Sequence, residues 1–163
     1  MYPPNPEFLY YFGTNALWKF YQDQRGDLNI RRLVSNVKSP ILLSPLTLLE
    51  FFGVLMKYYR KRFIKRKDIH AIADRLRRDT GIGASKRSFQ VIPIPTGAFR
   101  EAESILLQYA GELDFQTNDA LHLAIVTQMR VTVTTALIFV TSDNALQRVA
   151  EKKGIDWYNP ESA

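Results

Sequence analysis

The order of apolar and helix-periodic segments restricts the fold of this chain more than any other feature. Short apolar runs bounded by turn residues alternate with longer stretches in which apolar residues recur every three to four positions. Strand and helix alternating in this way are typical of a parallel sheet covered by helices on both faces. We therefore expect an α/β fold, with strands over 8–12, 40–43, 89–92, 136–141 and 156–158.

Helices are expected between these strands. Ser44 and Pro45 open one of them, with a capping hydroxyl followed by a proline at the first helical position. The 163 residues contain no repeat or interdomain linker, so a single domain over 1–163 is expected. One helix starts at Thr14 or Asn15, and the others are expected over 28–37, 45–59, 65–78, 98–111, 117–129 and 142–153.

Composition excludes several classes of site. The chain has no cysteine, which excludes disulfides and thiolate metal sites, and two histidines cannot form a histidine-rich zinc site. The N-terminal sequence lacks a basic segment followed by an apolar one, so we expect no signal peptide. The longest apolar tract, 41–56, is too short and too interrupted to span a bilayer. A cytoplasmic protein with no membrane contact is expected.

Positive charge is concentrated in one segment. Residues 57–87 contain twelve Lys or Arg and three Asp, so they carry +9 while the rest of the chain carries −3. Such a block favours a polyanionic partner, RNA or DNA foremost, with a solvated helix surface as the alternative. The aromatic residues Tyr58, Tyr59 and Phe63 would stack on bases or pack at a dimer interface. The residues expected to bind the RNA backbone are Arg60, Arg62, Lys65 and Arg66.

Three acidic residues fall at the starts of helices that are entered from one side of the expected sheet. Glu50 lies in an apolar stripe, where it either reaches water or meets a positive charge. Asp119 and Asp143 lie in first helical turns, where capping alone would account for them. Their shared placement indicates a hard cation, Mg²⁺ or Mn²⁺, because converging carboxylates repel one another without one.

The motifs "GTNAL", "LSPLTLLEFFGVL", "TNDALHLAIV" and "IFVTSDNALQRVAEKKGIDWYNP" resemble those of PIN-domain proteins, especially VapC-type toxin ribonucleases. The resemblance covers nearly the whole chain, with "DALHLA" and "VTSDNALQRVAEKKGI" its most specific parts. It implies a three-layer α/β/α fold with a central parallel β-sheet. It also implies a Mg²⁺- or Mn²⁺-dependent endoribonuclease, a homodimer, and neutralisation by a VapB-like antitoxin.

By this resemblance Glu50, Asp119 and Asp143 are the catalytic and metal-binding acids. The family typically has an aspartate directly before Thr-Asn, and here Gly13 stands in its place. His122 is expected to be a packed core histidine rather than a ligand. The supporting polar residues near the metal are Thr14, Asn15, Thr141 and Ser142.

Three explanations of Gly13 remain open at this point. It is a turn glycine in a homologue that lost activity, or it is compensated by Asp23 or Asp27, or it was introduced or selected to disarm a toxic nuclease. The first and third explanations predict impaired cleavage, whereas compensation by Asp23 or Asp27 predicts an active enzyme. The alternative functions are a catalytically inactive PIN-fold module that binds RNA or an antitoxin partner, and a nuclease that acts on DNA.

Overall fold

Five short strands form one sheet in the order β3-β2-β1-β4-β5, and every neighbouring pair is parallel. The computed structural model describes residues 4–81 and 87–162, so Lys86 of the basic segment lies outside the described part. The strand in the centre, β1, pairs with β2 on one side and with β4 on the other. The strands are β1 (Leu9–Phe12), β2 (Ile41–Leu43), β3 (Phe89–Val91), β4 (Leu137–Val140) and β5 (Trp157–Tyr158).

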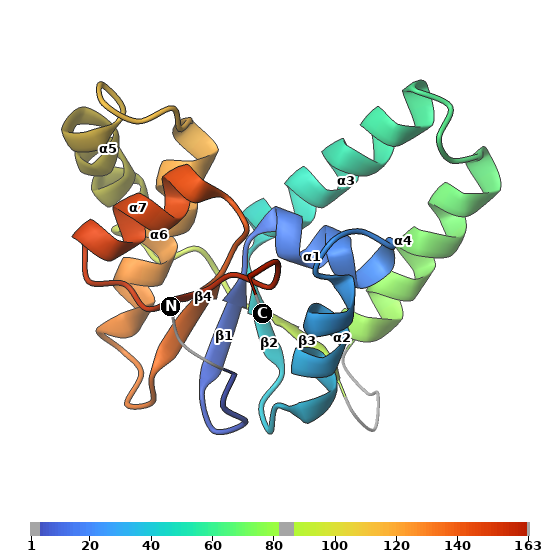
Figure 1. Cartoon of the computed structure of the whole chain (residues 1–163), viewed down its shortest axis with the longest axis horizontal. Coiled ribbons are helices and arrows are strands. Elements are labelled where there is room, and N and C mark those ends of the chain that lie inside the picture. The colour runs from blue at the N-terminus through green and yellow to red at the C-terminus, as the bar shows by residue number, and fades with distance from the viewer. Residues whose placement is uncertain (1–3, 82–86, 163) are drawn as a thin grey trace.

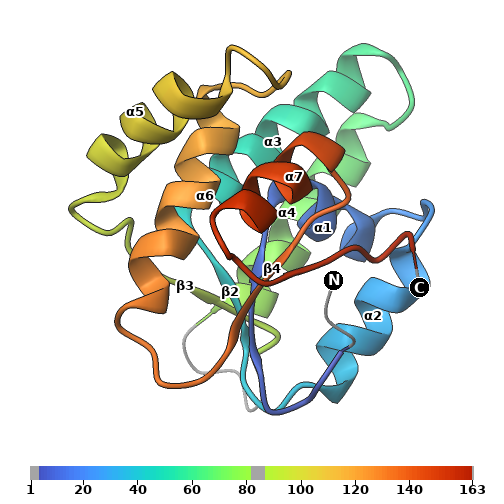
Figure 2. The same ribbon diagram turned by 60° about the vertical axis from the view of Figure 1, so that its left-hand side comes forward.

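Helices in the described residues cover both faces of this sheet. In Figure 1, α5, α6 and α7 lie to the left of the strands, and α1, α2 and α4 lie to the right. Figure 2 shows α5 running along α6 at the edge of the molecule. The helices are α1 (Thr14–Tyr21), α2 (Asp27–Asn36), α3 (Pro45–Arg60), α4 (Arg66–Thr80), α5 (Ala98–Tyr109), α6 (Thr117–Arg130) and α7 (Asn144–Lys152).

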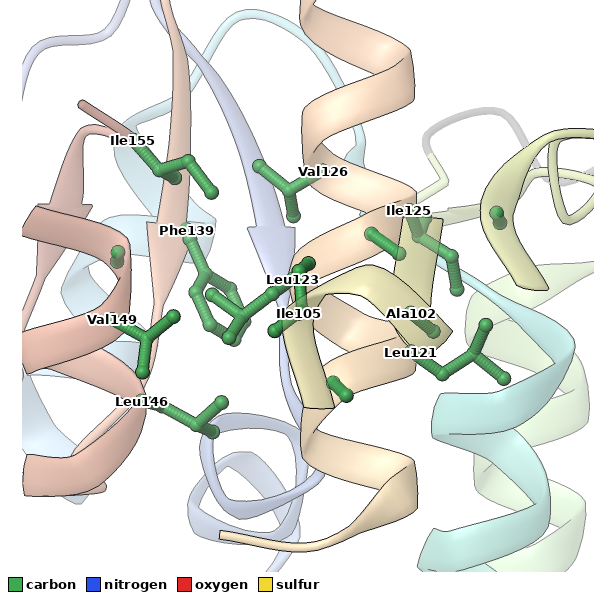
Figure 3. Close-up of a cluster of buried hydrophobic side chains, with 14 of the residues drawn as sticks. Ala102, Ile105, Leu121, Leu123, Ile125, Val126, Phe139, Leu146, Val149 and Ile155 are labelled. Atoms are coloured by element: carbon green, nitrogen blue, oxygen red, sulfur yellow. The ribbon is translucent and has the colours of Figure 1, made fainter. Parts of the chain in front are cut away.

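Alternation of side chains along β1 divides the core into two clusters. Tyr10 and Phe12 point to the face covered by α1, α2 and α4, whereas Tyr11 points to the face covered by α6. Successive residues of a strand face opposite sides, so a strand buried on both sides needs a continuous apolar run. On the α6 face, Leu123 and Val126 pack with Phe139 of β4, as Figure 3 shows.

The helices that follow β1, β2 and β4 all begin at the carboxyl ends of these strands. Ser44 caps α3 as expected, because its hydroxyl accepts a hydrogen bond from the Thr47 amide at 3.2 Å. From there α3 runs away from the sheet, and Figure 1 shows α3 and α4 forming an arm on one side of the molecule. This arrangement brings the first turns of three helices to one edge of the sheet.

The expected strands and helices are all present, and their bounds differ from the predicted ones by one or two residues. The predicted α/β architecture with a central parallel sheet is therefore confirmed. Over the residues that the structure describes, none of the helices has the length and apolar character that crossing a bilayer requires.

Candidate active site

A pocket of about 290 Å³ opens at the carboxyl edge of β1 and β4. All three acids that the sequence singled out lie on its wall: Glu50 from α3, Asp119 from α6, and Asp143 at the start of α7. The three acids that the sequence singled out thus lie on one pocket. Its other lining residues are Gly13, Thr14, Asn15, Trp18, Val54, His122, Thr141 and Leu146.

The surroundings of Glu50 differ from the buried apolar stripe that was expected. The stripe was misplaced, because Leu49 is 73% exposed, whereas Phe51 and Leu55 form the buried face of α3. Glu50 lies beside that face and accepts hydrogen bonds from three side chains. The donors are Thr14 Oγ1, His122 Nε2 (2.7 Å) and Asn118 Nδ2 (2.8 Å).

Burial acts to raise the pKa of Glu50, but the hydrogen bonds from His122, Thr14 and Asn118 outweigh burial and hold this pKa below its usual value. Glu50 is therefore a carboxylate whose charge is already compensated by protein donors. From the sequence we expected Glu50 either to reach water or to meet a positive charge. In the structure, three side-chain hydrogen-bond donors contact its carboxylate.

Asp119 is the third residue of α6 and closes a capping interaction there. One of its oxygens, Oδ2, accepts a hydrogen bond from the Gln116 amide at 2.8 Å. Burial raises the pKa of Asp119, and the negative charges of Asp143 and Glu50 raise it further. In contrast to Glu50, Asp119 therefore carries negative charge that the surrounding protein compensates only in part.

Asp143 is the N-cap of α7. Its Oδ1 accepts hydrogen bonds from the amides of Ala145 (2.8 Å) and Leu146 (3.0 Å). The capping explanation is thus correct for both Asp119 and Asp143, yet each uses one carboxylate oxygen. No hydrogen bond to the other oxygen of either residue is found among residues 4–81 and 87–162.

Asn15 connects α1 to the loop that holds Asp143. Its amide nitrogen donates to Thr141 Oγ1 at 3.3 Å, and its Oδ1 accepts from the Ser142 amide at 3.4 Å. Thr141 Oγ1 also accepts from the Asp143 amide at 3.1 Å. These bonds connect Asn15 and Thr141 to the loop that carries Asp143. Ser142 takes part through its backbone amide and is not part of the pocket wall.

Gly13 lies on the pocket wall, but its backbone does not require glycine. Its φ of −70° and ψ of 169° are available to any residue. A Cβ atom would lie 3.3 Å from Phe139 Cε2, so a side chain fits after a small movement of that ring. Backbone freedom therefore does not explain Gly13. Compensation by Asp23 or Asp27 is not supported either, because both pair with Arg31.

His122 is the residue that sequence reasoning undervalued. It is only 3% exposed, as a core histidine should be, yet its Nε2 reaches Glu50 in the pocket wall. Its other nitrogen, Nδ1, is 2.8 Å from the hydroxyl of Tyr11. The spacing of three residues from Asp119 on one face of a helix was the signal that could have placed it in the site.

A divalent cation fits this donor set only in part. Within the described residues, no three His, Asp or Glu side chains approach one another as a ready metal-ligand group. However, Asp119 and Asp143 each retain an oxygen without a hydrogen bond among the described residues, and the negative charges of Asp143 and Glu50 add to the burial that raises the pKa of Asp119. Mg²⁺ is commonly held by one or two carboxylates with several waters, which matches such a site.

The arm formed by α3 and α4, called the basic arm below, adjoins this pocket. A hollow of about 560 Å³ shares Thr14, Glu50 and Val54 with the pocket and extends to Lys57 and Arg60. A further hollow of about 510 Å³ includes Arg60, Arg62 and Lys65. Of the four cations predicted to bind RNA, Arg66 is the one that lines neither hollow.

The three aromatic residues of the arm behave differently from one another. Tyr58 is not free to stack on a base, because its ring lies 4.7 Å from that of Trp18 and its hydroxyl accepts from Gln24. Tyr59 lines the hollow beside Arg60 and is 37% exposed, and Phe63 is 71% exposed. Only Tyr59 and Phe63 therefore remain available to a partner.

Comparisons with known proteins give one family and several similar folds. The PIN domain family matches residues 10–152. No curated protein matches the sequence. The crystal structure of FitAcB from Neisseria gonorrhoeae superposes with a TM-score of 0.65 at 18% identity, over 93% of this chain and 98% of that one.

Two further solved structures are similar in fold. VapBC2 from Rickettsia felis, bound to a DNA fragment from its promoter, matches with a TM-score of 0.61 at 16% identity, over 93% of this chain and 98% of that one. VapC20 from Mycobacterium tuberculosis, a sarcin-ricin loop cleaving toxin, matches with a TM-score of 0.60 at 14% identity, over 85% and 93%. At these identities the likeness establishes a shared fold, which is the fold that the motifs predicted.

Proposed function

Because the chain belongs to the PIN domain family, we propose that it is a VapC-type endoribonuclease that depends on Mg²⁺ or Mn²⁺ and is impaired by Gly13. PIN domains are typically nucleases that use divalent metal ions. The observation that carries the proposal is the pocket at the carboxyl edge of the sheet, whose wall contains Glu50, Asp119 and Asp143. The fold likeness to VapC20, which is named as a sarcin-ricin loop cleaving toxin, supports RNA as the substrate.

The proposal includes the context in which such an enzyme works. We propose a single PIN-like domain over 1–163, which the family match over 10–152 supports. We also propose a cytoplasmic homodimer that a VapB-like antitoxin neutralises. The similarity in fold to VapBC2, whose structure was solved on promoter DNA, supports this partner.

In the proposed mechanism the acids have separate roles. Asp119 and Asp143 would hold the cation through the oxygens that capping leaves free, and Glu50 would complete the site directly or through water. When bound, the cation would supply the Lewis acidity for phosphodiester hydrolysis, by lowering the pKa of water and neutralising charge on the phosphate. Asp143, which caps α7, would also orient the attacking water.

The hollow beside Glu50 provides the path for the RNA backbone. Its outer end carries Lys57 and Arg60, and its wall near the pocket is formed by Leu49 and Gly53 of α3. None of Lys57, Arg60, Arg62 and Lys65 takes part in an ion pair within the described residues, so their charges remain available to phosphates. Phosphate groups of a single strand would bind these cations while the scissile bond lies over the acids.

Gly13 weakens this site by removing one carboxylate from four. Loss of that charge lowers the affinity for a cation, because fewer ligands compensate the cost of removing water from the cation. The same loss reduces repulsion between the pocket and a phosphate. The chain as it stands should therefore bind RNA well and cleave it slowly.

The decisive experiment restores the missing acid. We expect Gly13→Asp to bind Mn²⁺ at least about 10-fold more tightly and to raise Mn²⁺-dependent cleavage of single-stranded RNA strongly, because it adds a ligand to the pocket. Isothermal titration and a gel cleavage assay would measure the two effects. The control is Gly13→Asn, which has nearly the same shape and also caps α1 but adds no charge.

Equal activity of Gly13→Asn and Gly13→Asp would show that shape or capping, not the carboxylate, is responsible. Absence of cleavage and of Mn²⁺ binding in the Gly13→Asp variant would contradict the proposed function. Single-stranded DNA in the same assay tests the alternative of a DNA-directed nuclease.

The second candidate function is a catalytically inactive module that binds RNA or an antitoxin. The three donors around Glu50 favour it, because they compensate this carboxylate without any cation. This candidate predicts tight, salt-dependent RNA binding by both Gly13→Asp and the unmodified chain, with cleavage by neither.

A further inference from the structure

A chain of hydrogen bonds runs from the start of α3 through β1 and α6 to the pocket. Ser44 Oγ lies 2.8 Å from the Tyr11 hydroxyl, which lies 2.8 Å from His122 Nδ1. His122 Nε2 in turn lies 2.7 Å from Glu50 Oε2. Ser44 and Tyr11 are fully buried, whereas His122, though only 3% exposed, lines the pocket together with Glu50. Residues far apart in the sequence are thus joined into one polar path.

The direction of each hydrogen bond follows from what the two ends can donate. A carboxylate can only accept hydrogen bonds, so in the bond between Glu50 and His122 the hydrogen is carried by His122 Nε2. Burial raises the pKa of Tyr11 to about 12, so its hydroxyl is protonated and donates to His122 Nδ1. A neutral imidazole with the hydrogen on Nε2 satisfies both bonds.

The other end of the path is satisfied in the same direction. Tyr11, having donated its hydrogen, accepts from the hydroxyl of Ser44, and Ser44 accepts from the Thr47 amide at 3.2 Å. Thr47 Oγ1 donates to the carbonyl oxygen of Phe12, also at 3.2 Å. Every member therefore has a partner without any charge on His122. A buried polar network of this kind is rigid only when it is complete in this way.

Packing prevents the imidazole from leaving this position. Its ring meets that of Tyr11 edge-on at 5.8 Å and stacks on that of Phe139 at 6.4 Å between centroids. Phe139 is itself fully buried in β4. The sheet therefore fixes His122, and His122 fixes one oxygen of Glu50.

We propose that Tyr11 and His122 form a positioning relay that holds the Glu50 carboxylate in place at the pocket for a divalent cation. The relay rests on the proposed function, because the cation is part of it. Neither residue needs to touch RNA or the cation. A histidine that orients a carboxylate ligand acts as outer-sphere support, and loss of such support typically lowers metal affinity about 10- to 100-fold.

Nitrogen-15 NMR of the unmodified protein without metal tests the relay itself. The chain has two histidines, and His70 is exposed on α4, so it provides an internal reference that averages over tautomers. We expect His122 to be a fixed Nε2–H tautomer with a hydrogen-bonded Nδ1. In Tyr11→Phe, the Nδ1 resonance should move toward that of a nitrogen without a hydrogen bond, while His70 stays unchanged.

Mn²⁺ titration tests what the relay does. We expect His122→Leu to bind Mn²⁺ about 10-fold or more weakly than the unmodified chain. His122→Gln, whose amide can donate to Glu50, should recover most of that loss, and Tyr11→Phe should lie between the two. Thermal unfolding of each variant without metal shows that it is folded.

The outcomes separate the relay from the proposed function. A fixed Nε2–H tautomer together with the ordered loss and rescue of Mn²⁺ affinity would support the relay. A His122 that averages between tautomers, or a His122→Leu variant that binds Mn²⁺ like the unmodified chain, would overturn it. If neither the unmodified chain nor Gly13→Asp binds Mn²⁺, the proposed function is wrong. The relay then has no role in holding a cation, even where the tautomer of His122 is fixed.

Discussion

Glu50 and Asp119 lie on the wall of one pocket, yet their surroundings shift the two pKa values in opposite directions. Burial affects both, but three side-chain donors reverse its effect at Glu50 and lower that pKa. At Asp119 the Gln116 amide and the nearby His122 oppose the effect of burial, whereas the charges of Asp143 and Glu50 add to that effect and the pKa stays raised. The fold thus favours the charged form of Glu50 and the neutral form of Asp119, so the two residues should contribute with opposite signs to the free energy of unfolding at neutral pH.

We expect Glu50→Gln and Asp119→Asn to change stability at pH 7 with opposite signs in the absence of metal. A glutamate whose pKa is lower in the folded than in the unfolded chain stabilises the fold at pH values above its unfolded pKa of about 4.3. This stabilisation is lost as pH falls through the folded pKa. Glu50→Gln is therefore destabilising at pH 7. A raised folded pKa means that ionised Asp119 costs stability, so Asp119→Asn is stabilising at pH 7. Urea unfolding in EDTA measures both.

In acid, both differences should disappear, because the unmodified carboxyls are then protonated as well. For Asp119 the difference should appear as pH rises from about 3.9 through its folded pKa. The same sign for both variants at pH 7 would contradict the environments described for these two residues. Addition of Mn²⁺ should reverse the advantage of Asp119→Asn, since only aspartate gains from the cation.

At the scale of elements, the acids of the site come from the second turn of α3, the first turn of α6 and the start of α7. Each of these helices has free amides at its start, and Asp119 and Asp143 satisfy some of them with one oxygen each. The second oxygen of each remains for another ligand. One residue type at a helix start can thus serve capping and cation binding together.

This dual role can be separated at α7. Asp143→Asn keeps an oxygen that accepts from the Ala145 and Leu146 amides, so we expect unfolding free energy close to that of the unmodified chain. Asp143→Ala removes the cap and should cost about 1 kcal/mol. Both should weaken Mn²⁺ binding and RNA cleavage, because both remove the charge.

Urea unfolding and Mn²⁺ titration of the two variants provide the comparison. A drop in stability of Asp143→Asn as large as that of Asp143→Ala would show that the charge, not the cap, stabilises α7. Full Mn²⁺ affinity in Asp143→Asn would remove Asp143 from the proposed cation site.

At the scale of the whole molecule, the basic arm and the acidic pocket are adjacent. The hollow that begins at Glu50 ends at Lys57 and Arg60, so opposite charges lie at the two ends of one surface. A polyanion bound to the cationic end would place part of its chain beside the acids. Such binding releases counterions and weakens with salt.

We expect the double variant Lys57→Gln/Arg60→Gln to bind single-stranded RNA more weakly and with a smaller salt dependence. Loss of two phosphate contacts should reduce the slope of log affinity against log salt by about 1.4. The control is Arg100→Gln/Arg130→Gln, which removes the same charge from exposed positions on α5 and α6. Fluorescence anisotropy at several salt concentrations would measure both, and equal slopes would mean that net charge, not the arm, binds RNA.

Much of the fold followed from the sequence because its signals are local. Apolar runs such as 137–140 mark buried strands, and the Ser44-Pro45 pair marks the start of a helix, whatever else the chain does. Strand alternating with helix leads to a parallel sheet, and the carboxyl ends of its strands then meet at one edge. That topology, together with the family motifs around Glu50, Asp119 and Asp143, led to the expectation that the three acids share one pocket, whose wall they form.

The electrostatics of the pocket followed only from the tertiary structure. His122, Tyr11 and Glu50 come from α6, β1 and α3, and no spacing in the sequence specifies which nitrogen of His122 reaches which carboxylate. Likewise, from the sequence alone the aromatic side chain of Tyr58 is a candidate for stacking on bases. Only the tertiary structure shows that its ring packs against Trp18 instead.

The sequence by itself therefore determined the elements, their order and the edge of the sheet where chemistry gathers, since each depends on neighbours in the chain. Tertiary structure decided which carboxylate is already compensated, which is not, and that Gly13 has a backbone any residue could adopt. Those properties depend on distances of a few ångströms between residues that are remote in sequence, and local patterns carry no information about them.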